Sequence, residues 1–244
     1  MSHPTLIFLH ALGMSGAEWR LVRESLDGFA SIAPDLPGFG AAADAGYRDV
    51  AAMADAVEGV VRGAGRCVLV GQSMGGKVAS VLAARGGGMS GIAGVVLVAA
   101  SPPSPEPIED MRRREMLGWA TPGPIGTGAA AAFVDGNCAR PLPAPLRHAA
   151  MADVRRSNPA AWRGWLEAGS REDWREAVGV VQLPALIVAG REDGDLGEAA
   201  QRKLNLPHYP DAQVRVIADA AHLIPLEQPG RLATLIRAFV ADQA

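Results

Sequence analysis

Cysteine is scarce: only Cys67 and Cys138 occur among the 244 residues. Neither belongs to a C-x-x-C pair, so the spacing gives no sign of a zinc site or a thiol redox motif. A chain of this length can bury a large core without disulfides or metals. Two free thiols are typical of a reducing compartment, and we expect a cytoplasmic protein.

The sequence also lacks an excess of one charge and lacks long apolar runs. It has 23 basic and 26 acidic residues, a formal net charge of −3, and no long block of one sign. We therefore expect no nucleic-acid partner, and the short basic run 112–115 is typical of a solvated helix face. No apolar run approaches the length of a membrane span, and MSHPTLIFLH lacks the pattern of a signal peptide. We expect no association with a membrane.

Short apolar runs alternate with helical segments along most of the chain. The runs are apolar on successive residues, which is typical of strands covered on both faces. Helical periodicity is clearest at 49–62, 75–85 and 229–242. The alternation predicts an α/β fold with a mostly parallel sheet of about six strands flanked by helices. The strand candidates are 5–10, 31–35, 67–71, 94–100, 184–190 and 213–219.

The alternation stops once, after the fourth strand candidate. No strand-like run appears between Pro102 and about Val181, a stretch that carries four of the five tryptophans. The sequence predicts a helical cap at 102–180, inserted into a core formed by 1–101 and 181–244. A cap of this composition would supply apolar walls to a pocket, and Trp119, Trp162 and Trp165 are the candidates for lining it.

The strongest chemical signal is Gly71-Gln72-Ser73-Met74-Gly75-Gly76. It is a G-x-S-x-G motif between an apolar strand and a helix, the context in which a serine stands exposed on a strained turn. The alternative is a glycine turn that only closes a crossover. We favour Ser73 as a nucleophile.

A serine hydroxyl needs a base to remove its proton. His222, in ADAAHLIPLEQP, follows the last strand candidate and precedes the last helix. That position places it at the same sheet edge as Ser73, where the sites of open α/β sheets lie. The other four histidines are less well placed, and His10 is expected to shape its loop.

The base in turn needs a carboxylate that orients it. Asp193 follows the strand candidate 184–190 and completes the chain order serine, acid, histidine. Glu192 and Asp195 are neighbouring alternatives. The developing oxyanion needs two donors, for which the backbone amides of Met74 and Leu12 are the candidates.

Four motifs together resemble those of the α/β-hydrolase superfamily, in the same order. HALG is similar to its oxyanion loop, DLPGFG (35–40) to its D-x-P-G-x-G turn, GQSMGG to its nucleophile elbow, and HLIPLEQP to its H-x-x-x-x-E-x-P ending. Two positions differ: Ala11 stands where the family has glycine, and Gln72 where it commonly has histidine. We expect Gln72 to be a packing position of little effect.

The resemblance implies a serine esterase acting on a small, apolar ester, without metal or cofactor. GQSMGGK is similar to the elbow of a small-esterase subgroup, which favours ester hydrolysis. The same triad also serves carbon–carbon bond hydrolysis, lactone opening, cofactor-free lyase chemistry and acyl transfer. A receptor-like protein with slow turnover is a further alternative. The sequence predicts a small-molecule partner and leaves the oligomeric state open.

Overall fold

The computed structural model describes residues 3–46, 49–85 and 91–242. Its centre is one sheet in which all paired strands run parallel, in the order β2-β1-β3-β4-β5-β6. The α/β fold and the six-stranded sheet expected from the sequence are confirmed. The strands are β1 (Thr5–Leu9), β2 (Ser31–Ile32), β3 (Cys67–Gln72), β4 (Ile92–Val98), β5 (Ala185–Gly190) and β6 (Gln213–Ile217).

The strand order reverses next to β1, and this reversal locates the site. The chain passes from β1 to β2 on one side and then returns to β3 on the other. In open α/β sheets, ligands bind beyond the carboxyl ends of the strands at such a switch point. The loops that follow β1 and β3 are those that carry Leu12 and Ser73.

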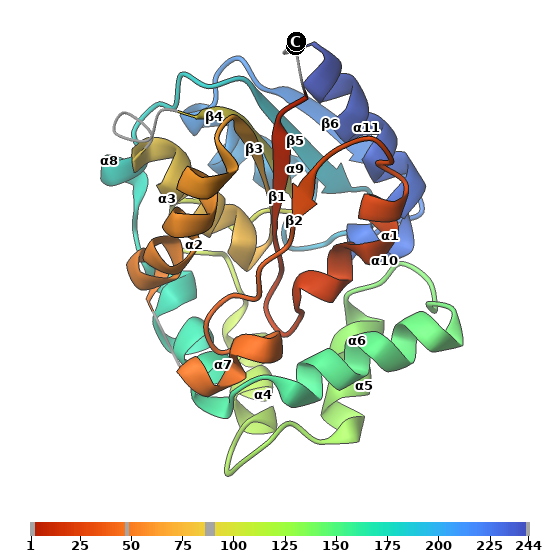
Figure 1. Ribbon diagram of the computed structural model, residues 1–244. Coiled ribbons are helices and arrows are strands. Elements are labelled where there is room, and N and C mark those ends of the chain that lie inside the picture. Colours follow the sequence, from red (N-terminus) through yellow and green to blue (C-terminus); the bar gives the residue numbers. More distant parts are fainter. Residues whose placement is uncertain (1–2, 47–48, 86–90, 243–244) are drawn as a thin grey trace.

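Helices cover both faces of the sheet (Figure 1). In chain order they are α1 (Arg20–Glu24), α2 (Val50–Ala64), α3 (Met74–Arg85), α4 (Asp110–Trp119), α5 (Thr127–Gly136), α6 (Ala144–Arg156), α7 (Pro159–Glu167), α8 (Arg175–Val178), α9 (Glu198–Leu204), α10 (Ile224–Glu227) and α11 (Pro229–Ala241). Short 3-10 turns lie at Gly16–Trp19, Gly40–Ala45, Gly169–Arg171 and Leu206–His208. No helix in the described ranges is both long and apolar enough to cross a membrane.

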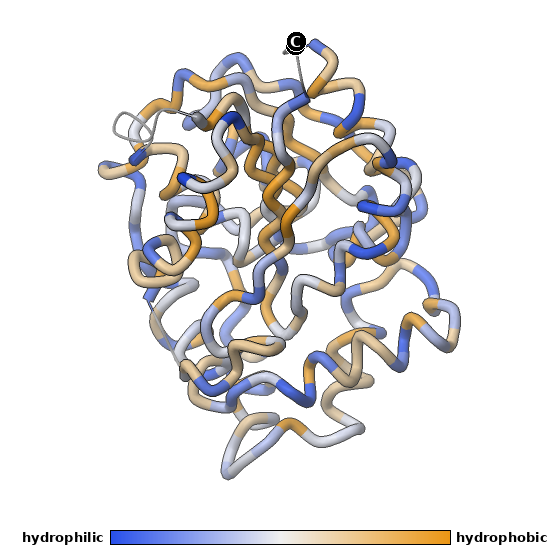
Figure 2. The backbone as a smooth tube through the Cα atoms, in the orientation of Figure 1, coloured by the Kyte–Doolittle hydropathy of each residue, from blue (hydrophilic) through white to orange (hydrophobic). Residues whose placement is uncertain are grey.

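Alternate residues of each inner strand enter two separate cores. In β1, Ile7 and Leu9 join the core beneath α2 and α3, whereas Leu6 and Phe8 join the core beneath α1 and α11. The inner strands are therefore mostly apolar, and Figure 2 shows them as hydrophobic segments at the centre of the molecule. This alternation is the physical reason why unbroken apolar runs predict strands covered on both faces.

The two edge strands do not follow that pattern, so the expectation of two covered faces is wrong for them. The burial of β6 alternates between exposed and half-buried residues as far as Val216, and only Ile217 is fully buried. The strand β2 has two residues, half-buried Ser31 and exposed Ile32. An edge strand has a neighbour on one side only, and here little of the chain covers its faces.

Local signals fix the helix ends. Asp49 accepts a hydrogen bond from the Ala52 amide at 2.8 Å and caps α2, which buries one face between Val50 and Val61. Asn158 caps α7 in the same way, with Pro159 as its first residue. A side-chain acceptor at this position satisfies an amide that the helix leaves unpaired.

Five helices, α4 to α8, lie between β4 and β5, although these two strands pair directly. The described chain contains no strand between Ala99 and Pro184. In Figure 1, α4 to α7 gather at the bottom of the view, beyond the carboxyl ends of the strands. We call residues 102–180 the helical insertion. Its position brings side chains of α4, α5 and α7 to the cavity that contains Ser73.

Candidate active site

Ser73 stands on a sharp turn between β3 and α3. Its φ angle of +48° lies in the left-handed region that residues with a side chain rarely adopt. Hydrogen bonds from Ser73 N to Val98 O (3.1 Å), and to Ser73 O from Gly76 N (2.8 Å) and Ser101 N (3.0 Å), hold this backbone. Strain of this kind costs about 1–3 kcal/mol and persists only where surrounding contacts impose it.

The glycines of the motif are required by close packing. A Cβ atom on Gly71 would lie 2.4 Å from Gly75 O, and one on Gly75 would lie 2.3 Å from Leu9 O. A Cβ atom on Gly76 would lie 2.4 Å from the Cβ of Ala100. These distances are far below van der Waals contact, so the turn can be built only without side chains there.

The loop after β1 lies beside this turn. Its left-handed residue is Gly13, with φ +76°, while Ala11 is not among the residues with positive φ. Alanine in place of the family's glycine therefore causes no strain. The Ala11 amide donates to the buried carboxyl of Glu18 at 3.3 Å, and burial raises the pKa of Glu18 well above its usual value. Leu12 lines the cavity.

The His10 side chain holds this loop through two hydrogen bonds to the backbone. The ring is fully buried; Nε2 accepts the Leu36 amide at 2.9 Å, so Nδ1 carries the proton and donates to Ala11 O at 2.8 Å. Burial lowers the pKa of His10 to about 4, against the opposing hydrogen bond and the charge of Asp35. A neutral imidazole with both nitrogens engaged fits the loop-shaping role expected from the sequence.

The structure brings His222 and Asp193 together. His222 Nδ1 and Asp193 Oδ2 are 2.9 Å apart, and both side chains are largely buried. The other oxygen, Asp193 Oδ1, accepts the amides of Leu196 (2.9 Å) and Asp195 (3.1 Å). The alternative carboxylates do not reach the ring: Glu192 binds the Ala220 amide at 3.0 Å, and Asp195 is exposed.

Electrostatics favour the charged pair. Burial opposes ionisation of Asp193, but the charge and hydrogen bond of His222, with the two backbone amides, hold the pKa of Asp193 below its usual value. Burial likewise opposes protonation of His222. The charge and hydrogen bond of Asp193, aided by Glu106 and Asp195, outweigh burial and raise the pKa of His222. The imidazolium is therefore stabilised at this position.

Hydrogen bonds of Gln72, Asn137 and Glu227 hold the loop of His222. The Gln72 amide donates to His222 O at 2.6 Å, which corrects the expectation that Gln72 only packs. His222 N donates to Asn137 O of the insertion at 3.0 Å. Glu227, the acid of HLIPLEQP, accepts the amides of Ala221 (2.9 Å) and Ala139 (2.6 Å). The motif signals Glu227, but no local pattern signals Gln72 or Asn137.

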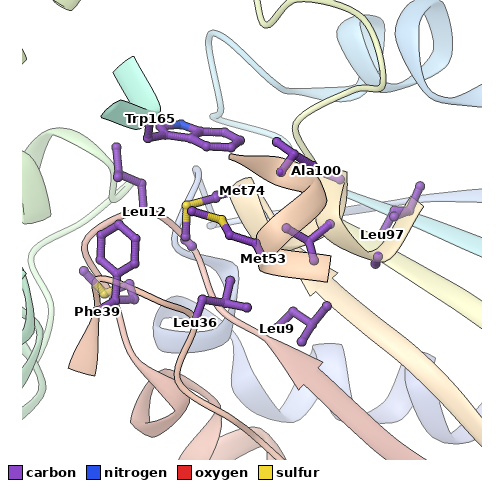
Figure 3. Close-up of a cluster of buried hydrophobic side chains, with 14 of the residues drawn as sticks. Leu9, Leu12, Leu36, Phe39, Met53, Met74, Leu97, Ala100 and Trp165 are labelled. Atoms are coloured by element: carbon purple, nitrogen blue, oxygen red, sulfur yellow. The ribbon is translucent and has the colours of Figure 1, made fainter. Parts of the chain in front are cut away.

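Ser73, Asp193, His222 and Leu12 all line one cavity. The Ser73 hydroxyl has no hydrogen-bond partner among the described residues and His222 Nε2 has none either, so both are available to a ligand. Met74 follows Ser73 at the start of α3, and its side chain belongs to the same buried apolar cluster as Leu12 and Trp165 (Figure 3). The remaining lining residues are Ala11, Glu106, Ile108, Arg112, Met116, Phe133, Asn137, Trp165, Asp195 and Leu196.

Of the three tryptophans expected in the pocket, Trp165 alone lines this cavity. Trp162 is fully buried; its indole donates to Met116 O at 2.8 Å, and its ring packs on Phe133 and Trp119. Trp119 lies beneath the guanidinium of Arg112. The pocket prediction is wrong for Trp119 and Trp162, because these rings join helices of the insertion to one another.

A buried lysine connects α3 to both ends of the insertion. Lys77, four residues after Ser73, is fully buried and lies 5.9 Å from the centre of the Trp165 ring. Its ammonium donates to the carbonyls of Ser104 (3.1 Å), Gly169 (3.4 Å), Ser170 (3.5 Å) and Glu172 (3.0 Å). Burial lowers the pKa of Lys77 to about 8, against the charges of Glu106, Glu172 and Asp173.

No group of three or more metal-ligating side chains occurs among the residues that the structure describes. The cavity presents the hydroxyl of Ser73, the imidazole of His222 and the carboxylate of Asp193. This set can perform nucleophilic and general acid–base steps.

Comparison with known proteins identifies the family of the chain. A model of the alpha/beta hydrolase family matches residues 6–235. The chain is similar to a pimeloyl-[acyl-carrier protein] methyl ester esterase of Aromatoleum aromaticum. The two are 28% identical over an alignment of 262 positions, which covers 98% of this chain and 99% of the relative. It is similar to a 2-succinyl-6-hydroxy-2,4-cyclohexadiene-1-carboxylate synthase of Salmonella paratyphi B, with 28% identity over 93% of this chain and 89% of the relative.

Among solved structures, a bromoperoxidase from Bacillus anthracis matches the fold with a TM-score of 0.87. The two chains are 18% identical, and the match covers 98% of this chain and 92% of the other. At this identity, the likeness concerns the fold and not the reaction.

Proposed function

The chain belongs to the alpha/beta hydrolase family, and from this premise we propose that it is a serine hydrolase that cleaves the carboxylic ester bond of a small substrate. The observation that carries the proposal is the 2.9 Å contact between His222 and Asp193 on the wall of a cavity that Ser73 also lines. A hydroxyl on a strained turn, a base and an orienting carboxylate are the three groups that acyl transfer to serine requires.

In the proposed acylation step, Ser73 Oγ attacks the ester carbonyl carbon while His222 Nε2 takes the hydroxyl proton. Asp193 holds the proton on Nδ1 and stabilises the imidazolium that forms. The carbonyl oxygen becomes an oxyanion, for which the amides of Leu12 and Met74 are the proposed donors. Each such donor is worth about 2.7–4 kcal/mol in the transition state.

The tetrahedral intermediate then expels the alcohol, which leaves with the proton from His222. This gives an acyl-enzyme on Ser73 and a neutral imidazole. In the second half-reaction, water attacks the acyl carbon, His222 takes one of its protons, and collapse returns that proton to Ser73 Oγ. The products are the alcohol and the carboxylic acid, and no cofactor enters the balance.

A cofactor-free synthase or lyase on the same triad is the second candidate, and the similarity to the Salmonella synthase supports it. We place ester hydrolysis first, because the match to the esterase covers 98% of this chain and 99% of that relative, against 93% and 89% for the synthase.

The experiment is a panel of p-nitrophenyl esters of increasing acyl length, assayed with wild type and Ser73→Ala. We expect turnover by wild type, and its loss in the variant with little change in thermal unfolding, because only a hydroxyl is removed. A fluorophosphonate should label wild type at Ser73 and leave the variant unlabelled. The proposal is wrong if Ser73→Ala keeps more than about a hundredth of the turnover, since a nucleophile contributes far more.

The panel also separates the other candidates. A synthase or lyase would turn over none of the esters yet would still need Ser73 for its own reaction. An acyltransferase would form a new ester when an alcohol is added. A receptor-like protein would bind an ester saturably and release no product.

A further inference from the structure

Glu106 is a carboxylate on the cavity wall that the proposed mechanism does not use. It lies between β4 and α4, and its side chain is half-buried. Its amide donates to Ser170 O at 2.7 Å, and Oε2 accepts the hydroxyl of the fully buried Ser101 at 2.7 Å. The other oxygen, Oε1, has no partner among the described residues. The backbone and one oxygen are thus fixed, and one oxygen remains for a ligand.

No cation in the described chain pairs with Glu106. Lys77 is near enough to influence its ionisation, but the Lys77 ammonium donates to four carbonyl oxygens. Burial raises the pKa of Glu106, while the Ser101 hydroxyl and the charges of Lys77, His222 and Arg113 oppose that rise. With Oε2 held by the Ser101 hydroxyl, the free Oε1 can accept a hydrogen bond from a donor that enters the cavity.

The remaining cavity charges do not compensate for Glu106. Asp195 also lines the cavity, and the charge of Asp193 is neutralised only when His222 is protonated. Arg112 is the single arginine or lysine among the lining residues. Its guanidinium is already 2.9 Å from Glu115 and lies 4.9 Å from the centre of the Trp119 ring. The cavity is thus lined by three carboxyl groups and one guanidinium, with His222 beside Asp193.

We propose that Glu106 determines specificity, so that the site takes esters whose remote end carries a hydrogen-bond donor, a hydroxyl or an ammonium, and rejects esters with a free carboxylate. The inference rests on the proposed function for the identity of the site. A donor would bind Glu106 Oε1, whereas a second carboxylate would face uncompensated negative charge in a partly desolvated cavity.

The test measures binding to Ser73→Ala protein, which retains the cavity and cannot turn the ligand over. Four methyl esters of matched length serve as probes: methyl hexanoate, methyl 6-hydroxyhexanoate, methyl 6-aminohexanoate and monomethyl adipate. We expect calorimetric affinities for the hydroxy and amino esters to exceed that for the adipate monoester by at least about tenfold, with methyl hexanoate between. Comparing the amino ester with the hydroxy ester shows whether the site requires a positive charge or only a hydrogen-bond donor.

Adding Glu106→Gln to this protein should reduce the ratio between amino ester and adipate monoester to less than about threefold. The amide can still accept the Ser101 hydroxyl, so the local structure is preserved. The matched control is Glu109→Gln, which removes an exposed carboxylate three residues away that does not line the cavity. Adding Glu109→Gln should leave the order of the four ester affinities as it is in the Ser73→Ala protein.

Equal affinities for all four esters, no measurable binding, or an unchanged ratio after Glu106→Gln would each overturn the inference. These outcomes are independent of turnover. If wild type hydrolyses p-nitrophenyl esters but the binding order fails, only the role of Glu106 is wrong. If the binding order holds but no ester is hydrolysed, the proposed function fails and the ligand class stands.

Discussion

The side-chain amide of Gln72 donates a hydrogen bond to the backbone carbonyl of His222 at 2.6 Å, across 150 residues of sequence. Gln72 immediately precedes Ser73, so this contact joins the turn of the proposed nucleophile to the loop of the proposed base. Gln72 is fully buried and His222 is half-buried. It fixes the relative position of two groups that must exchange a proton.

We predict that Gln72→Leu lowers kcat by about tenfold or more, the equivalent of roughly 1.4 kcal/mol in the barrier. Leucine fills similar space but cannot donate to His222 O, so the imidazole would sample more orientations. KM should change less, because Gln72 is not among the residues that line the cavity. Steady-state kinetics on a p-nitrophenyl ester check this. An unchanged kcat in a folded variant would return Gln72 to a packing role.

The contact also marks the limit of what the sequence can predict. Ser73, Asp193 and His222 could be predicted because each lies in a short motif at a strand's end, and the positions of the strands along the chain follow from local patterning. The partners of Gln72 and the charge balance of Glu106 depend on segments that meet only after folding. The alternation of β6, in contrast, is readable in the sequence, because Gln213, Val214, Arg215 and Val216 alternate between polar and apolar residues.

The tryptophans show the same limit within one helix. Trp162 and Trp165 are three residues apart in α7, and composition alone cannot say which one lines the cavity. The rotation of α7 against α4 decides it: Trp162 Nε1 reaches Met116 O, and Trp165 lies on the side of Lys77 and the cavity.

The acid of the proposed triad has a matched pair of tests. We predict that Asp193→Asn lowers turnover by about 10⁴, because the amide favours the wrong tautomer of His222. Asp195→Asn should stay within about tenfold of wild type, since Asp195 is exposed and acts on the ring only through its charge. Ester hydrolysis by purified, folded variants ranks the two. The reverse ranking would assign the acid to Asp195.

The pH dependence has a definite sign. His222 must be neutral to accept the proton of Ser73, and its pKa is raised above 6.5 because the carboxylates, Asp193 foremost, outweigh burial. As pH falls through that raised pKa, kcat/KM should therefore decline, with an apparent midpoint above 6.5. Removing one favourable charge with Asp195→Asn should move the midpoint down. Initial rates between pH 5 and pH 9 measure it, and a wild-type midpoint below 6.5 would contradict the electrostatic picture.

Two single-ring substitutions separate packing from selectivity. Trp162→Phe removes the donor to Met116 O inside a buried cluster, and we predict a loss of about 1–3 kcal/mol in the free energy of unfolding. The preferred acyl chain length should be unchanged. Trp165→Phe should change that preference, because Trp165 lines the cavity. Denaturant titrations and the ester panel give the two readouts. A selectivity change confined to Trp162→Phe would mean that the cavity wall is set by the cluster behind it.

Lys77 provides a test of how the insertion is fastened to the core. Its pKa is lowered to about 8 from the ordinary 10.5, since its protonated form is buried. Between these two values the unfolded chain holds a proton that the native protein has released. The free energy of unfolding must then rise with pH across this window, by up to about 3 kcal/mol for this group. The group contributes no pH dependence below about pH 8, where both states are protonated.

Cys67 contributes with the opposite sign, because burial raises the pKa of its thiol to about 11. Burial raises the pKa of Cys138 as well. The contributions of Cys67 and Cys138 cancel when the free energy of unfolding of Lys77→Met is subtracted from that of wild type. We predict that this difference grows in favour of the wild type from pH 8 to pH 10.5. Lys203→Met, at the only other lysine and an exposed one, should follow the wild type. Urea titrations at several pH values give the curves. Parallel curves for wild type and Lys77→Met would mean that Lys77 is solvated in the native protein, and that its four carbonyl contacts do not fasten the insertion.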